Sequence, residues 1–149
     1  MQVKSFISTI PGTLDGKGRV CIPAPYRQLL SAQETPGVYL CQSLSDPAIE
    51  GFGAAVLNDL SEDLESKNPI YAKGYEVLSS VLSEIQSLPF DENGRVRLPE
   101  NLIEFSGLKD KVVFVGLGKK FQIFDPERFA TVRVERLKKA LALKNGETP

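Results

Sequence analysis

The sequence predicts an α+β protein built from two copies of one structural unit, related by a pseudo-twofold axis within the chain. Three observations lead to this prediction: a ten-residue segment occurs twice, the same pattern of helix and strands follows each copy, and the composition is ordinary. With 149 residues, of which 42% are hydrophobic and 25% charged, the chain matches soluble globular proteins and can bury one substantial core.

The repeated segment occupies Leu14–Pro23, and its second copy, Phe90–Pro99, begins 76 positions later. Asp, Gly, Arg, Val and Pro are identical in the two copies, and two further positions are apolar in both. Five identities in ten residues indicate an internal duplication, which sets the architecture of the whole chain.

Each copy is followed by the same succession of elements. A short helical pattern comes first, and two runs of β-branched and aromatic residues follow it as strands. These elements are a helix at 24–30 with strands at Val38–Cys41 and Ala48–Phe52 in the first copy, and a helix at Glu100–Phe105 with strands at Lys111–Gly116 and Phe121–Phe124 in the second. The two halves are therefore expected to share one fold.

A longer helix is predicted after each copy, and a third joins the halves. Asp125 is a favourable N-cap and Pro126 suits a first helical turn, so the last helix begins there. The connecting helix starts near Asn68 and ends before Pro89. The apolar positions of the three helices, in chain order, are Val56, Leu57, Leu60 and Leu64; Val77, Leu78, Val81, Leu82 and Ile85; and Phe129, Val132, Leu137 and Leu141.

Both repeated segments have the pattern of a β-hairpin in which Asp and Arg stand four residues apart around a tight turn. Asn93-Gly94 is a favoured turn dipeptide because both positions tolerate positive φ, and Lys17-Gly18 is a weaker version of it. Alternation along the outgoing strands sends the valines inward and places Arg19, Cys21, Arg95 and Arg97 on the other face, so the arginines should face solvent or a partner. Asp15 and Asp91 are placed where each carboxylate can orient a guanidinium by paired hydrogen bonds.

Two such hairpins related by the pseudo-twofold would present a rigid cationic edge. A β-ribbon can enter a DNA groove, where arginine can read guanine edges and lysine neutralises phosphate. The candidate DNA-binding residues are Asp15, Lys17, Arg19, Asp91, Arg95 and Arg97. A single Asp–Arg pair would as readily be a salt bridge that pins its hairpin, and the duplication favours the contact role.

Composition excludes several functional classes. The chain has no histidine, which removes histidine-based acid–base and nucleophilic catalysis and the commonest zinc sites. Cys21 and Cys41 form no metal or redox motif and are expected to be packing residues of strands. No secretory or membrane-spanning segment is recognisable, so an intracellular protein is expected. The net charge of −1 gives no global basic field, so nucleic-acid binding must depend on local patches or on assembly.

The motif Leu14-Asp-Gly-Lys-Gly-Arg-Val, the following Ile22-Pro-Ala and Tyr26-Arg, and the second copy with Val113-Phe-Val-Gly resemble the MraZ family of bacterial transcriptional regulators from about Phe6 to Phe129. The resemblance implies a duplicated SpoVT-AbrB-type swapped-hairpin β-barrel with short helices. It also implies a ring-shaped homo-oligomer that binds repeated boxes in promoter DNA and represses its own division and cell wall operon, in the cytoplasm and at the nucleoid. The family's Asp-x-x-x-Arg signature carries over to Asp15 with Arg19 and to Asp91 with Arg95.

On this basis we expect two SpoVT-AbrB-type units at 7–54 and 83–128, a helical connector at 55–82, a C-terminal helix at 129–143 and a disordered tail at 144–149. The sequence departs from the family in two places. Members of the family often carry an arginine-rich helix between the halves, whereas the segment 71–86 has Lys73 as its one basic residue. Glu92 also adds an acid to the second turn. The first hairpin is therefore expected to contact DNA more closely than the second.

Two other functional classes were weighed against DNA binding. An enzyme is not expected, because no base accompanies either thiol and a carboxylate beside arginine has a lowered pKa. An AbrB-like antitoxin or another protein-interaction module without operator recognition remains the alternative, with the apolar helices as docking surfaces. No cofactor, metal or small-molecule substrate is expected. The acidic first trailing helix and the basic last helix are either solvated faces or complementary surfaces of neighbouring subunits.

Overall fold

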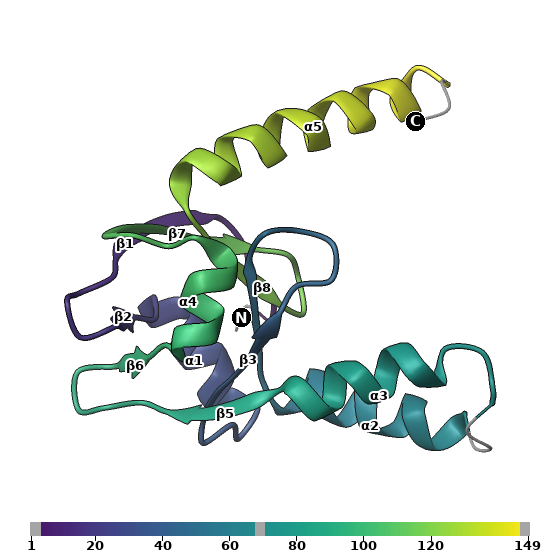
Figure 1. Cartoon of the computed structure of the whole chain (residues 1–149), viewed down its shortest axis with the longest axis horizontal. Coiled ribbons are helices and arrows are strands. Elements are labelled where there is room, and N and C mark those ends of the chain that lie inside the picture. The colour runs from purple at the N-terminus through teal and green to yellow at the C-terminus, as the bar shows by residue number, and fades with distance from the viewer. Residues whose placement is uncertain (1–3, 68–70, 147–149) are drawn as a thin grey trace.

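The computed structural model describes residues 4–67 and 71–146 (Figure 1). The elements in chain order are β1 (Thr9–Thr13), β2 (Arg19–Cys21), α1 (Ala24–Ala32), β3 (Gly37–Gln42), β4 (Ile49–Phe52), α2 (Ala54–Ser66), α3 (Tyr75–Glu84), β5 (Gln86–Pro89), β6 (Arg95–Arg97), α4 (Glu100–Ser106), β7 (Lys111–Gly116), β8 (Phe121–Phe124) and α5 (Pro126–Lys144). The α+β prediction is confirmed, as are the strands and helices expected after each repeated segment.

The strands form a six-stranded sheet in the order β1-β7-β8-β4-β3-β5 and a two-stranded sheet of β2 and β6, with antiparallel pairing throughout. Strands β1 and β5 hold equivalent positions in the two copies, just before the repeated segment. Each pairs with a strand of the other copy: β1 with β7, and β5 with β3. The two halves of the chain are therefore interleaved within one sheet.

The short β2–β6 ladder joins the repeated segments directly. Val20 lies opposite Val96, which is its own counterpart in the second copy, and Arg19 lies opposite Arg97. The ladder is thus symmetric about the valine pair. Both valines are buried, as alternation along these strands predicts, because the arginines occupy the other face.

The core lies on both faces of the sheet. On one face the rings of Phe6, Tyr26, Phe114 and Phe121 pack together, with centroids 5.0–6.4 Å apart. On the other face a smaller cluster of Ala48, Val113, Val115 and Phe124 receives Phe129 from α5. Strand β7 is apolar at every position from Val112 to Val115 because both its faces are covered.

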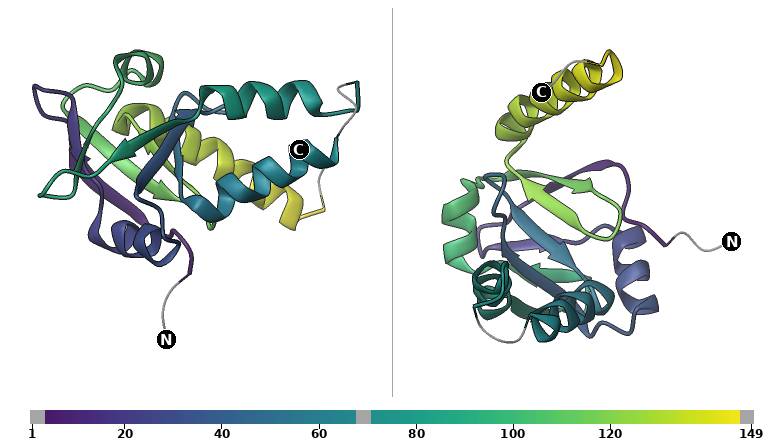
Figure 2. Two further views of the ribbon diagram at one scale, coloured as in Figure 1. Left: turned by 90° about the horizontal axis from the view of Figure 1, so that it is seen from below. Right: turned by 90° about the vertical axis from the view of Figure 1, so that its right-hand side faces the viewer.

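Two helical elements extend from this body. Helices α2 and α3 form a hairpin on one side, and α5 begins on the sheet and then stands off it (Figures 1 and 2). The predicted N-cap of α5 is confirmed, since the Asp125 carboxylate accepts a hydrogen bond from the backbone N–H of Arg128. Helix α5 continues through Lys144, and Asn145 and Gly146 follow as a turn; the last three residues of the predicted tail, 147–149, lie outside the described residues.

One part of the predicted connecting helix is wrong. Helix α3 ends at Glu84, and Gln86–Pro89 forms β5. The apolar stripe continues through Ile85, but the backbone there is already extended, with φ −65° and ψ 131°. Pro89 disfavours helical backbone in the residue before it, so a further helical turn would not fit this segment. Pairing with β3 instead provides its backbone hydrogen bonds. The predicted start of this helix, Asn68–Pro69, lies outside the described residues.

Candidate nucleic-acid interface

The first Asp-x-x-x-Arg segment forms a closed hairpin in which one carboxylate organises the whole loop. Asp15 accepts hydrogen bonds at Oδ1 from the backbone N–H groups of Lys17 and Arg19, both at 2.9 Å. Its other oxygen, Oδ2, lies 2.8 Å from Nε of Arg19. The aspartate therefore fixes the turn and the direction of the arginine at the same time.

The second hairpin repeats this arrangement almost atom for atom. Asp91 Oδ1 accepts from the backbone N–H groups of Asn93 and Arg95 at 2.8 and 2.9 Å, and Oδ2 lies 2.9 Å from Arg95 Nε. The side chains of Arg19 and Arg95 are 30% and 32% exposed. The duplicated sequence thus produces a duplicated geometry.

The turn itself differs from the two-residue turn expected from Asn93-Gly94. Only the glycines adopt positive φ, 78° at Gly18 and 74° at Gly94, whereas Asn93 and Lys17 do not. Each glycine N–H donates to the aspartate carbonyl three residues earlier. Each loop is a three-residue connection with a left-handed glycine. This form is favoured because the aspartate carboxylate accepts hydrogen bonds from backbone N–H groups of the loop, which a two-residue turn would leave exposed to solvent.

Hydrogen bonding keeps both aspartates ionised. The backbone N–H of Arg19 is the main cause that lowers the pKa of Asp15 to about 2, and the Arg19 side chain adds to it. The pKa of Asp91 is lowered in the same way, first by the backbone N–H of Arg95. Both Asp–Arg pairs are therefore charged throughout the neutral pH range.

The two hairpins are connected into one edge. Beyond the β2–β6 ladder, the N–H of Ile22 donates to the carbonyl of Gly94, and the N–H of Leu98 donates to the carbonyl of Gly18. The turn of each hairpin is thus bonded to the strand of the other. The structure brings all six predicted residues onto this hairpin edge: Asp15, Lys17, Arg19, Asp91, Arg95 and Arg97.

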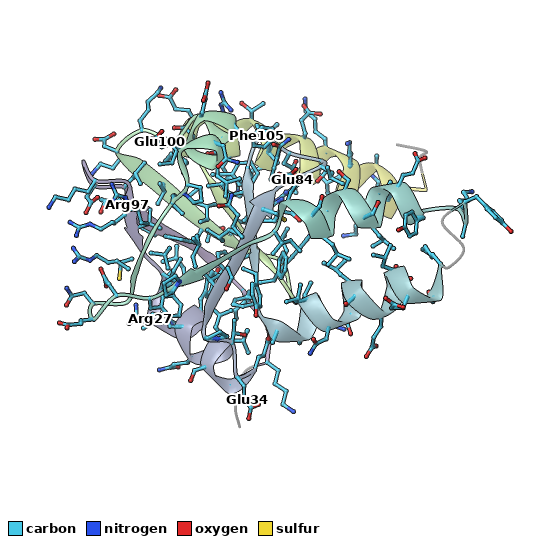
Figure 3. All side chains as sticks on the ribbon, turned by 60° about the horizontal axis from the view of Figure 1, so that its bottom comes forward. Arg27, Glu34, Glu84, Arg97, Glu100 and Phe105 are labelled. Atoms are coloured by element: carbon cyan, nitrogen blue, oxygen red, sulfur yellow. The ribbon has the colours of Figure 1, made fainter. Side chains whose placement is uncertain are left out.

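Figure 3 shows Arg97 projecting from the end of the molecule opposite the α2–α3 hairpin, with Arg27 on the same side. Lys17 and Arg97 are exposed, while Arg19 and Arg95 are partly covered by their aspartates. Glu92 is also exposed, as its place in the second turn suggested. The hairpin edge thus presents four basic side chains outward, with the acid at one end.

Sequence reasoning missed the contribution of Arg27, which lies on α1. Its guanidinium donates to the carbonyl of Ile22 and packs on Gly94, where an added Cβ would lie 2.7 Å from Cζ. Arg27 therefore packs against the second turn and stabilises it. The available signal was a basic residue in the helix that directly follows the first hairpin strand.

The two cysteines differ from each other. Cys41 is buried as predicted, and burial raises the pKa of its thiol to about 11. Cys21 lies on the outer face, as alternation along the strand predicts, but the expectation that it is a packing residue is wrong, since it is exposed and its Sγ lies 3.5 Å from Nη1 of Arg27. Strand β2 buries Val20 on its inner face, so Cys21 shares the outer face with Arg19.

A buried polar cluster was also missed. Gln122 is 1% exposed; its amide donates to Asp46 and Glu50, and its carbonyl accepts from Arg136 at 2.8 Å. Burial raises the pKa of Asp46, but hydrogen bonds from Gln122 and Ser45 and the charge of Arg136 outweigh it and lower that pKa. No local pattern links residues so far apart in sequence.

Within 4–67 and 71–146, no group of three or more metal-binding side chains comes together. In the same part of the chain, no helix combines the length and the apolar character needed to cross a membrane.

Comparison with known proteins identifies the family. Residues 81–143 match the family model described as "MraZ protein, putative antitoxin-like". Proteins named transcriptional regulator MraZ from Xanthobacter autotrophicus, Azorhizobium caulinodans and Parvibaculum lavamentivorans are 37%, 38% and 38% identical to this chain. The matches cover 91%, 95% and 92% of this chain and 90%, 94% and 86% of those proteins. The chain therefore belongs to the MraZ family.

Proposed function

We propose that this protein is a sequence-specific DNA-binding transcriptional regulator that represses its own division and cell wall operon. In this proposal the hairpin edge binds repeated boxes in the promoter. The observation that carries it is the pair of matching Asp–Arg hairpins, tied together by β2 and β6. The names of the related proteins support a regulatory role.

The geometry of each Asp–Arg pair suits base reading. The aspartate engages Nε of its arginine, and neither Nη group of Arg19 or Arg95 has a partner within the described residues. The two terminal amino groups are therefore free and held in one direction. Arginine recognises guanine O6 and N7 with paired N–H donors, and a preoriented side chain loses less entropy on binding.

Phosphate contacts are assigned to Lys17 and Arg97. Both side chains are exposed beside Arg19 and Arg95, the arginines that we assign to bases, and neither belongs to the Asp–Arg pair of its hairpin. Such contacts give affinity and register without reading sequence, and they make binding depend on salt. Glu92 weakens the field around the second turn, so the first hairpin contributes more.

A net charge of −1 is compatible with this role if several copies act together. Each chain would make few phosphate contacts, and a ring of chains on repeated boxes would multiply them. We propose self-assembly into such a ring-shaped homo-oligomer for this reason.

We also propose that the strands make the duplicated SpoVT-AbrB-type swapped-hairpin barrel. The exchange of β1 and β5 between the copies supports it. Closure between the ends of the six-stranded sheet would run through β2 and β6. A bridge between Leu14 and Val20 and the hydrogen bond from Asp91 N–H to the Arg95 carbonyl support that path.

The alternative function is that of an antitoxin-like protein-interaction module. The description of the family model names this class. An antitoxin of that kind would depend on its partner protein for stability or high affinity. A regulator would instead bind its promoter as a purified protein with nothing added.

The test is a titration of the purified protein with DNA from its own promoter and with scrambled DNA, at two salt concentrations. Arg19→Ala should weaken promoter binding about 10- to 100-fold and reduce the preference over scrambled DNA. Arg95→Ala should have a smaller effect in the same direction. Lys119→Ala is the matched control, because Lys119 is an exposed cation outside the hairpin edge. Its neighbour Gly118 forms a β-bridge with Phe6, before the start of β1, whereas the first hairpin begins after the end of β1.

Selective binding by the wild type, lost in Arg19→Ala and kept in Lys119→Ala, supports the hairpin as the reading element. Equal binding of promoter and scrambled DNA at both salts would refute operator recognition. Equal losses in the arginine variants and in Lys119→Ala would indicate a general charge effect and would refute the assigned role.

A further inference from the structure

Helices α2 and α5 hold equivalent positions in the two copies but differ in what covers them. Each follows the last strand of its copy, α2 after β4 and α5 after β8. Helix α2 is packed along its length by α3, whereas in the described residues no helix follows α5 (Figure 1). The second half of the molecule thus lacks the cover that the first half has.

The uncovered part of α5 carries an apolar stripe. Ala130, Val134, Leu137 and Leu141 follow one another at intervals of four, three and four residues, the spacing of a helix that packs against other helices. The last three of these side chains are 51%, 60% and 49% exposed. Toward the body, α5 is held by Phe129 and Arg136, so the stripe has no partner among residues 4–67 and 71–146.

Basic residues surround this stripe. Helix α5 contains six basic and two acidic residues. Arg128 and Arg136 bond to the body, and the remaining basic residues are exposed: Arg133, Lys138, Lys139 and Lys144. Arg133 and Lys138 directly flank the stripe, at the positions that choose partners in helix pairs.

The α2–α3 hairpin has the opposite character. Its two helices contain six acidic residues and no basic residue, and none of their side chains is fully buried. Val77 is 56% exposed. At the C-terminal end of α3 a groove of about 340 Å³ is lined by Leu44, Val81, Glu84 and Leu102, among others. The hairpin therefore presents apolar surface bordered by acidic side chains, which is complementary to a basic helix with exposed leucines.

We infer that α5 of one copy docks on the α2–α3 hairpin of a second copy and completes a three-helix cluster there. The inference deepens the proposed function, because it rests on the self-assembly included in that proposal and names its interface. Charge complementarity selects the occupant, since α5 carries a net positive and the hairpin a net negative charge. The contact joins two different surfaces, so it can repeat from copy to copy, and it closes a ring when its rotation divides a full turn evenly.

The two surfaces leave the hairpin edge free. In Figures 1 and 3 the β2–β6 strands and Arg97 lie at one end of the molecule, and α2 and α3 extend from the other. Assembly through α5 therefore does not compete with the proposed DNA contacts.

The test measures molar mass by light scattering over a range of concentrations, at low salt and without DNA. The full chain should assemble. Leu137→Asp should weaken association at least tenfold. Leu143→Asp is the matched control: Leu143 is 59% exposed on the same helix, but it lies roughly half a turn from Val134 and away from the stripe. This variant should assemble normally.

Charge reversal identifies the partner surface. Arg133→Glu with Lys138→Glu should prevent assembly, and so should Glu62→Lys with Glu65→Lys. Mixing these two reversed proteins should restore assembly, because the acidic α5 of one then meets the basic hairpin of the other. All four positions are exposed, so circular dichroism and the thermal transition should match the wild type.

Three outcomes would overturn the inference. A wild-type monomer at every concentration would remove the assembly, a result independent of whether Arg19 reads DNA. Assembly unaffected by Leu137→Asp would place the interface elsewhere. Failure of the two reversed proteins to restore assembly when mixed would show that these charges do not face each other, and would exclude this pairing of α5 with the hairpin.

Discussion

The two turn glycines offer a sharp test of how the hairpins are built. Gly18 and Gly94 have φ of 78° and 74°, where a side chain costs about 1–2 kcal/mol. At Gly18 an added Cβ would make only ordinary contacts, with Ile103 Cδ1 at 3.6 Å and the Leu98 carbonyl oxygen at 3.8 Å, so Gly18→Ala should cost about 1–2 kcal/mol. At Gly94 the Cβ would lie 2.7 Å from the Arg27 guanidinium. Arg27 must then shift and lose its hydrogen bond to Ile22, which adds about 1 kcal/mol.

The matched control lies in the same loop. Gly16 does not have positive φ, and nothing lies within 4 Å of its added Cβ, so Gly16→Ala should be neutral or stabilise by up to about 1 kcal/mol. Urea denaturation gives the free energies of unfolding, and each kcal/mol should shift the melting temperature by about 2–4 °C. Gly18→Asn should recover part of the loss, because asparagine tolerates left-handed backbone. If Gly16→Ala destabilises as much as Gly18→Ala, the left-handed turn does not explain the glycine requirement.

Two further predictions concern titration and burial. Asp15 has a pKa of about 2 in the folded state, and that of Asp91 is also lowered, against about 3.9 in an unfolded chain. The stability that the two ionised aspartates contribute is therefore present above pH 4 and is lost as the pH falls toward 2. The contribution of Asp15 to the urea midpoint should not change between pH 5 and 8. A midpoint that changes over that range in the wild type but not in Asp15→Asn would contradict this assignment. Tyr26 donates its hydroxyl to the carbonyls of Ile7 and Ser8, and Tyr26→Phe should cost about 1 kcal/mol in calorimetry; no change would mean that water replaces the bond without loss.

The local elements could be predicted from the sequence because their signals are local. Lys111–Gly116 and Phe121–Phe124 were predicted with the boundaries that the structure has, since each is a mostly apolar run that ends at a clear break, Gly116 in the first and Asp125-Pro126 in the second. The strand Gln86–Pro89 was missed because Ile85 continues the apolar stripe of α3 and hides the change of period. Its strand character comes from pairing with β3, which no local pattern contains.

More of the candidate site than of the strand order could be predicted from the sequence. Alternation along the strands told which face Arg19 and Arg95 occupy, and the repeat placed an aspartate beside each. Alternation does not tell which strand is the partner, so the exchange of β1 and β5 between the copies could not be derived. The packing of Arg27 on Gly94 and the Asp46–Gln122 contact were missed for the same reason, because both depend on the tertiary arrangement of the two copies.

The covalent link between the copies bears on how the proposed activity depends on concentration. The hairpins meet through the β2–β6 ladder, whose strands belong to one chain. Their pairing is intramolecular and does not weaken on dilution, unlike the same ladder made by two separate chains. The association that we infer through α5 is intermolecular and would weaken on dilution. Dilution should therefore leave each chain with a complete pair of arginines and remove only the gain from several chains on one promoter, so the salt dependence of binding should become shallower as the protein is diluted.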